Sequence, residues 1–351
     1  TQPPHLPELF SPAPPVAIHR PAPGAVIQRN METTTMNSFK EKFATDVDQG
    51  LSSNPKTLPS RYFYDARGDK LFQDIMRMPE YYLTDCEYEI LNLQKNDILQ
   101  AVQKDRKFNL VELGAGDGYK TKLLLQHFLE QGVDFEYFPV DISHDVLLEL
   151  ENSLKKQFPT LKVTPLNYEY FEALERLNDL DHSPKVILFL GSNIGNFSPE
   201  RAHSFFAKLN HTMQAGDALL SGIDLKKDPR TILMAYNDPT GITKAFNMNL
   251  LHRMNRELGA NFVVENFDHY PTYDPFTGEA RSYLMSTVDQ EVYIATLDKT
   301  FSFAHSEPVH TEISRKYSLN EINELASQAG FNVQKHFTDS KGYFVDTLWR
   351  K

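Results

Sequence analysis

The stretch Phe108-Asn-Leu-Val-Glu-Leu-Gly-Ala-Gly-Asp-Gly-Tyr-Lys120 decides the fold of this 351-residue chain. Its apolar first half predicts a buried strand, and a loop with three glycines follows at once. Glycine has no Cβ, so backbone N–H groups in such a loop can approach a ligand closely. The residues after the loop, from Leu123 to Leu129, carry leucine and phenylalanine at helical spacing. A strand, a glycine loop and the positive end of a helix together predict a ligand site at the edge of a parallel sheet.

Strands and helices alternate after this stretch. Four more runs of strand length follow, separated by helical patterns, at residues 135–141, 161–166, 185–190 and 217–224. Near the C-terminus, residues 331–336 and 343–349 predict a β-hairpin. This pattern predicts an α/β protein with a Rossmann-like, doubly wound sheet that closes with a terminal hairpin.

The region from 226 to 315 breaks this alternation. It contains a helical pattern at 243–258 and strand-like runs at 261–267, 280–287, 291–297 and 299–304. We therefore expect a second, α+β substrate-binding domain, built from residues 38–85 and 227–315. The sheet domain then comprises residues 86–226 and 316–351, and the substrate binds between the two.

Residues 1–37 precede both predicted domains. They are rich in proline and lack apolar periodicity, which predicts a disordered or extended lead-in. Met31 is a suitable native start, so residues 1–30 are expected to lie outside the native chain. The folded part is therefore expected to begin near residue 38.

Bulk composition narrows the classes of function. The chain is 40% hydrophobic and 24% charged, which is typical of a soluble globular protein with a sizeable core. Its net charge of −11 argues against a nucleic-acid or anionic membrane partner, because phosphate binding needs clustered lysine and arginine. No apolar run approaches the ~20 residues of a membrane span. The single cysteine, Cys86, cannot form an internal disulfide, so we expect a cytoplasmic protein.

Asp141, at the end of the second predicted strand, indicates what the glycine loop holds. An acid at this position can accept hydrogen bonds from both ribose hydroxyls of an adenosine. A nicotinamide dinucleotide and S-adenosylmethionine both fit, and a loop that makes only a tight turn is the structural alternative. The G-x-G-x-G spacing, with Glu112 two residues before Gly114, departs from the dinucleotide fingerprint G-x-G-x-x-G. Asp117 also suits a cationic sulfonium better than a pyrophosphate, so S-adenosylmethionine is the expected cosubstrate.

Several motifs occur along the chain in a specific order. They are Tyr62-Phe-Tyr-Asp-Ala-Arg-Gly68, Pro79-Glu-Tyr-Tyr82, Leu110-Val-Glu-Leu-Gly-Ala-Gly116, Phe189-Leu-Gly-Ser-Asn-Ile-Gly-Asn196, Tyr236-Asn-Asp238 and Thr311-Glu-Ile-Ser314. From about residue 38 to the end, the chain thereby resembles the histidine-specific S-adenosylmethionine-dependent methyltransferases of ergothioneine biosynthesis. The resemblance implies a class I methyltransferase fold. It also implies trimethylation of the α-amine of L-histidine, which gives hercynine.

The resemblance implies a role for each matching residue. The cosubstrate-binding positions are Gly114, Gly116, Lys120 and Asp141 in the sheet domain and Tyr81 in the other domain. The substrate-binding positions are Asn196 and Tyr236 for the carboxylate and amino end, Tyr64 near the amine, and Glu312 and Ser314 for the imidazole ring.

Two positions depart from the pattern of the family. Asn167-Tyr168 stands where the family usually has an Asp-Phe pair beside the adenine, and the amide oxygen of Asn167 can still meet the adenine amino group. Ser282 stands where the bacterial enzyme has a methionine against the ring, and the smaller side chain is expected to loosen the substrate pocket.

Methyl transfer from a sulfonium depends on positioning and desolvation more than on a strong base. The attacking amine must be neutral, and a pocket that holds a cationic sulfonium lowers the pKa of an amine. Tyr64 is the candidate catalytic residue, because its phenol is placed to take the amine proton. A water molecule is the alternative. The histidines form no metal-binding motif, so no metal is expected.

Other functions stay open at this point. One is N-methylation of another aromatic amino acid or of an amine, for example tryptophan. Another is a nicotinamide-dependent oxidoreductase, and a third is a catalytically silent protein that only binds the cosubstrate. For the histidine methyltransferase we expect a monomer whose substrate is a small molecule, L-histidine.

Overall fold

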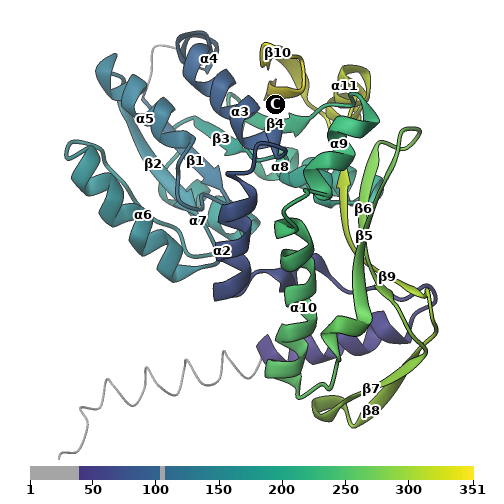
Figure 1. Cartoon of the computed structure of the whole chain (residues 1–351). Coiled ribbons are helices and arrows are strands. Elements are labelled where there is room, and N and C mark those ends of the chain that lie inside the picture. The colour runs from purple at the N-terminus through teal and green to yellow at the C-terminus, as the bar shows by residue number, and fades with distance from the viewer. Residues whose placement is uncertain (1–38, 103–106) are drawn as a thin grey trace, which may run out of the picture.

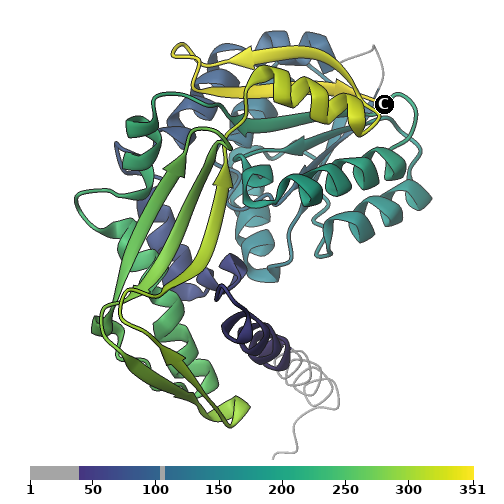
Figure 2. The ribbon, with the colours of Figure 1, turned by 90° about the vertical axis from the view of Figure 1, so that its right-hand side faces the viewer.

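The computed structural model describes residues 39–102 and 107–351 (Figure 1). Within these ranges the chain forms a six-stranded, a three-stranded and a two-stranded sheet. Figure 2 shows the long strands of the three-stranded sheet leading away from the six-stranded sheet toward the two-stranded one. The predictions for residues 1–37 fall outside the described ranges.

The six-stranded sheet has the order β10-β11-β4-β3-β1-β2. Its strands are β1 (Phe108–Leu113), β2 (Phe135–Val140), β3 (Lys185–Phe189), β4 (Ala218–Asp224), β10 (Asn332–Thr338) and β11 (Phe344–Arg350). The first four strands pair in parallel, and β11 lies antiparallel to both of its neighbours. This order confirms the predicted doubly wound sheet and its terminal hairpin.

Side chains alternate between the two faces of this sheet, as the period of a strand requires. Leu110 packs on one face and the next residue, Val111, packs on the other. The first face is covered by α3 (Tyr82–Leu93), α4 (Lys95–Val102), α5 (Thr121–Glu130) and α6 (His144–Gln157). The second is covered by α7 (Tyr170–Leu180), α8 (Pro199–Thr212) and α11 (Leu319–Gln328).

Serine side chains cap three helices. Ser143, Ser198 and Ser318 each accept a hydrogen bond from a backbone N–H in the first turn of α6, α8 and α11. Ser318 and Glu321 also form a capping box. The sequence pattern of residues 86–99 predicts a single helix, which is wrong, because the structure divides that region into α3 and α4.

The third predicted strand, residues 161–166, is not a full strand. Val163 and Leu166 form only isolated parallel bridges with β2. The reason lies in β2 itself, because Pro139 has no N–H to donate and interrupts the ladder in its middle. The segment still runs along the outer edge of β2 and extends the sheet.

The region that follows β4 holds the other two sheets. The three-stranded sheet joins β5 (Phe267–Asp274), β6 (Glu279–Ser286) and β9 (Pro308–Arg315), and β7 (Gln290–Ile294) pairs with β8 (Lys299–Phe303). Helices α9 (Pro229–Tyr236) and α10 (Ile242–Leu258) precede them. The strand predicted at 261–267 is wrong, since most of it lies in a loop and the turn η3 (Val264–Asn266).

Residues before α3 pack against this region. They form a helix over residues 39–52, the turn η1 (Ser60–Phe63) and α2 (Ala66–Ile75). Phe43, Phe63 and Ile75 share one apolar core with Phe246 and Val309. We propose on this basis that residues 38–85 and 227–315 form the second domain. Within the described ranges, no helix has the length and apolar character needed to cross a bilayer.

Candidate active site

The glycine loop after β1 has the backbone geometry that its composition predicts. Gly114, Gly116 and Gly118 have φ angles of 76°, 54° and 65°, in the left-handed region that favours glycine. A Cβ on Gly116 would meet no atom within 4 Å, so the space beside it is open. The loop can therefore receive a ligand against its backbone, next to the N-terminus of α5.

Asp141 lies beside this loop. Its Oδ2 is 3.4 Å from the backbone N of Gly116, and its Oδ1 accepts a hydrogen bond of 3.0 Å from the backbone N–H of Ser143. The amide nitrogen of Asn167 donates to the backbone oxygen of Asp141 at 3.0 Å, which leaves the Asn167 amide oxygen for a ligand. Asn167 and Tyr168 also line a hollow beside α6. These predicted cosubstrate residues thus lie together at the carboxyl edge of β1 and β2.

Lys120 is held by a fully buried acid that sequence analysis missed. The side chain of Glu87, on α3, forms an ion pair with Lys120. Its Oε1 and Oε2 lie 2.8 Å and 3.1 Å from the backbone N of Gly191, in the loop after β3. Burial opposes the charge on Lys120, but Glu87 outweighs it and raises the pKa of the lysine. Lys120 therefore helps to join the glycine loop to the loop after β3.

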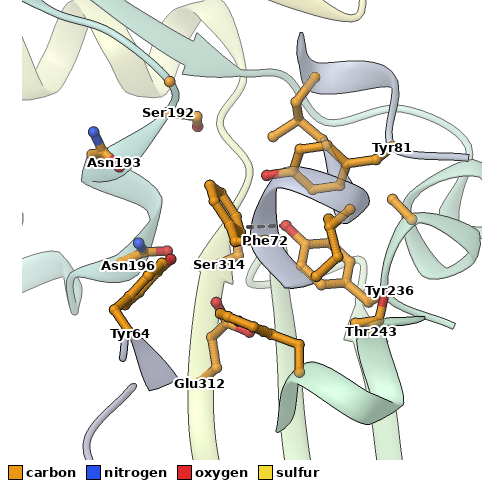
Figure 3. Close-up of a pocket in the computed structure, with 15 residues that line it drawn as sticks. Tyr64, Phe72, Tyr81, Ser192, Asn193, Asn196, Tyr236, Thr243, Glu312 and Ser314 are labelled. Atoms are coloured by element: carbon orange, nitrogen blue, oxygen red, sulfur yellow. Dashed lines mark hydrogen bonds between the residues drawn. The ribbon is translucent and has the colours of Figure 1, made fainter. Parts of the chain in front are cut away.

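A pocket lies next to these loops, where the six-stranded sheet meets β9 and α10. It gathers six residues predicted from the resemblance, namely Tyr64, Tyr81, Asn196, Tyr236, Glu312 and Ser314. In the view of Figure 3, Glu312 and Ser314 on β9 lie between the pair Tyr64 and Asn196 and the pair Tyr81 and Tyr236. Residues from five separate parts of the chain thus face one cavity.

Aromatic side chains form one wall of this pocket. The ring of Phe72 lies 5.6 Å from that of Tyr64, 6.4 Å from that of Tyr81 and 5.8 Å from that of Phe246, measured between centroids. All four rings line the cavity. The aromatic residues between positions 62 and 82 therefore have two roles. Phe63 packs in the apolar core, and Tyr64, Phe72 and Tyr81 form a wall of the pocket.

One of the residues that line the pocket, Glu312, has a carboxyl group with a raised pKa. Burial raises the pKa of Glu312 to about 7, although the positive charge of Lys316 opposes the rise. Glu312 and Ser314 are two residues apart on β9, so their side chains project from the same face of the strand. A ring that enters the pocket can meet both.

Two hydroxyl groups and a buried ammonium meet beside Glu312. Tyr236 Oη lies 2.8 Å from Ser314 Oγ, and Lys316 Nζ lies 2.7 Å from the first and 2.9 Å from the second. The same ammonium is 2.8 Å from Oδ2 of Asp224, and neither Lys316 nor Asp224 has any exposed surface. Sequence analysis did not predict Lys316, although positions 312, 314 and 316 share the period of a strand.

Tyr64, the predicted catalytic residue, is not poised to ionise. It keeps 42% of its surface exposed, but desolvation of its phenol, followed by the charge of Glu312, raises its pKa well above the ordinary value. The neutral phenol persists at physiological pH. Its chemistry in the pocket is therefore that of a neutral hydrogen-bonding group rather than an ionised base.

Ser282 is not among the residues that line the pocket. It lies on β6, opposite Glu312 in the register, and is buried. Its hydroxyl oxygen is 3.2 Å from Nε2 of His269 on β5. The side chain is therefore engaged within the three-stranded sheet.

The two parts of the site suit two ligands, an adenosine-bearing cosubstrate and an amino acid. The open loop at Gly116, the acceptors of Asp141 and the Asn167 amide oxygen suit S-adenosylmethionine, and the adjoining pocket suits a small amine with a polar ring. Among the described residues, no group of three or more His, Cys, Asp or Glu is arranged to hold a metal ion.

Comparison with known proteins identifies the family of this chain. A family model described as histidine-specific methyltransferase, SAM-dependent, matches residues 43–351. The histidine N-alpha-methyltransferases of Mycolicibacterium smegmatis and Mycobacterium tuberculosis are each 34% identical, covering 88% and 87% of this chain and 94% of each relative. Ergothioneine biosynthesis protein 1 of Schizosaccharomyces pombe is 30% identical and aligns over 79% of this chain and 36% of its own, longer one. The chain therefore belongs to the histidine-specific, S-adenosylmethionine-dependent methyltransferase family.

Proposed function

We propose that this protein transfers methyl groups from S-adenosylmethionine to the α-amine of L-histidine, three times in succession, to give hercynine. The observation that carries this proposal is the placing of Glu312 and Ser314 on one strand face in the pocket beside the glycine loop. A carboxylate and a hydroxyl at this spacing suit the two nitrogens of an imidazole ring.

The amino end of the substrate belongs at the other end of the pocket, near Asn196 and Tyr64. Bound there, S-adenosylmethionine supplies an electrophilic methyl group on a sulfonium. The ring of Phe72, 5.6 Å from that of Tyr64, limits the contact of this end with water and disfavours a charged amine, which keeps the nitrogen lone pair available. Alignment of the two reactants is then the main contribution of the protein to the rate.

The proton released by the amine has no strong base beside it among the described pocket residues. Desolvation keeps Tyr64 protonated, and Glu312 belongs to the ring end of the pocket. We therefore propose that water at the pocket mouth takes the proton, and that Tyr64 positions the amine.

We also propose that the protein acts as a cytoplasmic monomer on a small-molecule substrate, without a nucleic-acid or membrane partner. The single cysteine, which is buried, and the acidic net charge support this.

Binding measurements test the proposal before any turnover is sought. We expect S-adenosylhomocysteine to bind in a calorimeter and NAD(P)H to give no heat. With S-adenosylhomocysteine present, L-histidine should bind more tightly than L-tryptophan or L-phenylalanine. A preference for another aromatic amino acid would replace histidine as the substrate, and binding of NAD(P)H alone would overturn the proposal.

A further inference from the structure

Lys316 is a fully buried cation whose three N–H donors all have partners. Its Nζ lies 2.8 Å from Asp224 Oδ2, 2.7 Å from Tyr236 Oη and 2.9 Å from Ser314 Oγ. An ammonium group has three protons and no lone pair, so it can only donate. Each of these three oxygens therefore accepts a hydrogen bond from Lys316.

The charge on Lys316 is permanent at physiological pH. Burial alone would lower its pKa, but the carboxylate of Asp224 outweighs burial and raises it. Asp224 in turn has a lowered pKa, because Lys316 and Lys227 offset its own burial. The charged groups around the two hydroxyls are thus Lys316, Lys227, Asp224 and, on the pocket side, Glu312.

The two hydroxyl groups have one proton left to donate to a ligand. Tyr236 Oη and Ser314 Oγ are 2.8 Å apart, so one of their two protons lies between them. A phenol is the better donor and an aliphatic hydroxyl the better acceptor, which places the phenolic proton in this bond. Ser314 then accepts from both Tyr236 and Lys316, its lone pairs are occupied, and its own proton is left for the pocket. In the opposite arrangement, the free proton belongs to Tyr236 instead.

We propose that Lys316 is a positioning residue that makes the Tyr236–Ser314 pair a hydrogen-bond donor toward the substrate ring. The inference rests on the proposed function, in which this part of the pocket holds the ring of histidine. It departs from the role that the resemblance implies for Tyr236, because the hydroxyl of this residue is bonded to Ser314 at the ring end. It assigns to Lys316 a role in specificity that it exerts through the two hydroxyls.

The consequence is a pocket that selects one protonation state of the substrate. Glu312, when ionised, accepts a hydrogen bond from a ring N–H, and the Tyr236–Ser314 pair donates to a bare ring nitrogen. A neutral imidazole has one nitrogen of each kind. An imidazolium has two N–H groups, and the second would face a donor. The ring of L-histidine is therefore bound in its neutral form, although a lone carboxylate would favour the cation.

Lys227 provides a matched control. It also pairs with Asp224, at 2.5 Å, and is nearly buried, but its other hydrogen-bond partners are Tyr82 and the backbone oxygen of Leu225. Lys227→Met and Lys316→Met each remove one buried cation from the same carboxylate and leave no hydrogen-bond donor in its place. Only Lys316→Met frees lone pairs on Tyr236 and Ser314.

The test compares L-histidine with 1,2,4-triazol-3-yl-L-alanine, whose ring has the same shape and stays neutral between pH 5.5 and 8. Calorimetry in the presence of S-adenosylhomocysteine gives both dissociation constants at each pH. Their ratio cancels the titration of Glu312 and of the α-amine, which the two ligands share. In the wild-type protein, the ratio of the histidine to the triazole dissociation constant should rise about tenfold per pH unit below the ring pKa of about 6.5.

In Lys316→Met we expect this ratio to stay within about twofold across the range, because the freed hydroxyls can accept from an imidazolium. Lys227→Met should follow the wild type, and unchanged binding of S-adenosylhomocysteine reports the fold of both variants. A flat ratio in the wild type would overturn the inference while histidine binding still supports the proposed function. If neither amino acid binds, both fail. The wild-type arm needs no variant, so it decides the matter even if Lys316→Met does not fold.

Discussion

Gly195 lies so close to Arg315 that a Cβ on the glycine would be 2.9 Å from the carbonyl oxygen of the arginine. This contact joins the turn η2 (Asn193–Asn196) to the end of β9. The turn carries Asn196, and the strand carries Glu312 and Ser314. One close backbone contact therefore sets the distance between the two ends of the substrate pocket.

Gly195→Ala should separate these ends. The added methyl cannot be accommodated without a shift of η2 or β9, because its neighbour is backbone and not a flexible side chain. We expect KM for L-histidine to rise at least tenfold, while the dissociation constant of S-adenosylhomocysteine changes less than threefold, on the scale of about 1.4 kcal/mol per factor of ten. Equal loss of both affinities would show that the contact serves general stability instead.

Glu312→Gln should impair catalysis in a pH-dependent way. The carboxylate is ionised above its pKa of about 7, and only then does it give a charge-assisted hydrogen bond to the ring N–H. At pH 8 we expect kcat/KM for L-histidine to fall roughly ten- to a hundredfold, the scale of about 1.5–3 kcal/mol for a bond to a charged group. At pH 6 the loss should be smaller, because the wild-type residue is then mostly protonated. A loss that is independent of pH would contradict the role of the charge.

The same substitution should stabilise the ligand-free protein at high pH. The folded-state pKa of Glu312 is raised to about 7 from 4.5, so between these values the folded protein holds a proton that the unfolded chain has lost. Stability of the wild type therefore falls as pH rises through this window and is constant above it. Because Glu312 is partly exposed, we expect Glu312→Gln to gain about 2 kcal/mol at pH 8 and little at pH 5. Thermal melts at both pH values check this, and a lower melting temperature at pH 8 would refute it.

Tyr64→Phe separates a positioning role from a base. Desolvation and the charge of Glu312 keep the phenol protonated, so its removal takes away a hydrogen bond and no base. We expect kcat to fall about tenfold or less, with the shape of the pH profile unchanged, since a neutral hydrogen bond contributes about 1 kcal/mol. A fall in kcat of more than a thousandfold, or a kcat that no longer rises with pH, would show that Tyr64 is the base.

The sheet domain could be predicted because its signals are local. The strand, the glycine loop and the helix from Phe108 to Leu129 follow one another in sequence, and each has its own pattern. The serine caps at Ser143, Ser198 and Ser318 act within one helical turn. The failure at residues 161–166 came from Pro139, which lies on the neighbouring strand and is invisible to a pattern within the segment itself.

The site could be predicted only in part. Glu312 and Ser314 were found through the family resemblance. Glu87 and Lys316 were missed because some of their partners, Gly191 and Tyr236, lie 104 and 80 residues away along the chain. Asp224 follows the pattern of Asp141 at the end of a predicted strand, yet the fold places it in a buried ion pair with Lys316. Such contacts depend on how distant segments of the chain pack against one another in the folded protein. One usable signal was Glu87 itself, a charged residue on the buried face of α3.

The most direct test of the central claim is the product formed from L-histidine and excess S-adenosylmethionine by the purified full chain. Mass spectrometry with fragmentation should show the mass of three added methylene groups, all located on the α-nitrogen and none on the ring, with S-adenosylhomocysteine formed in step. An unchanged L-histidine in the presence of a bound cosubstrate, or a methyl group on the imidazole ring, would contradict the account.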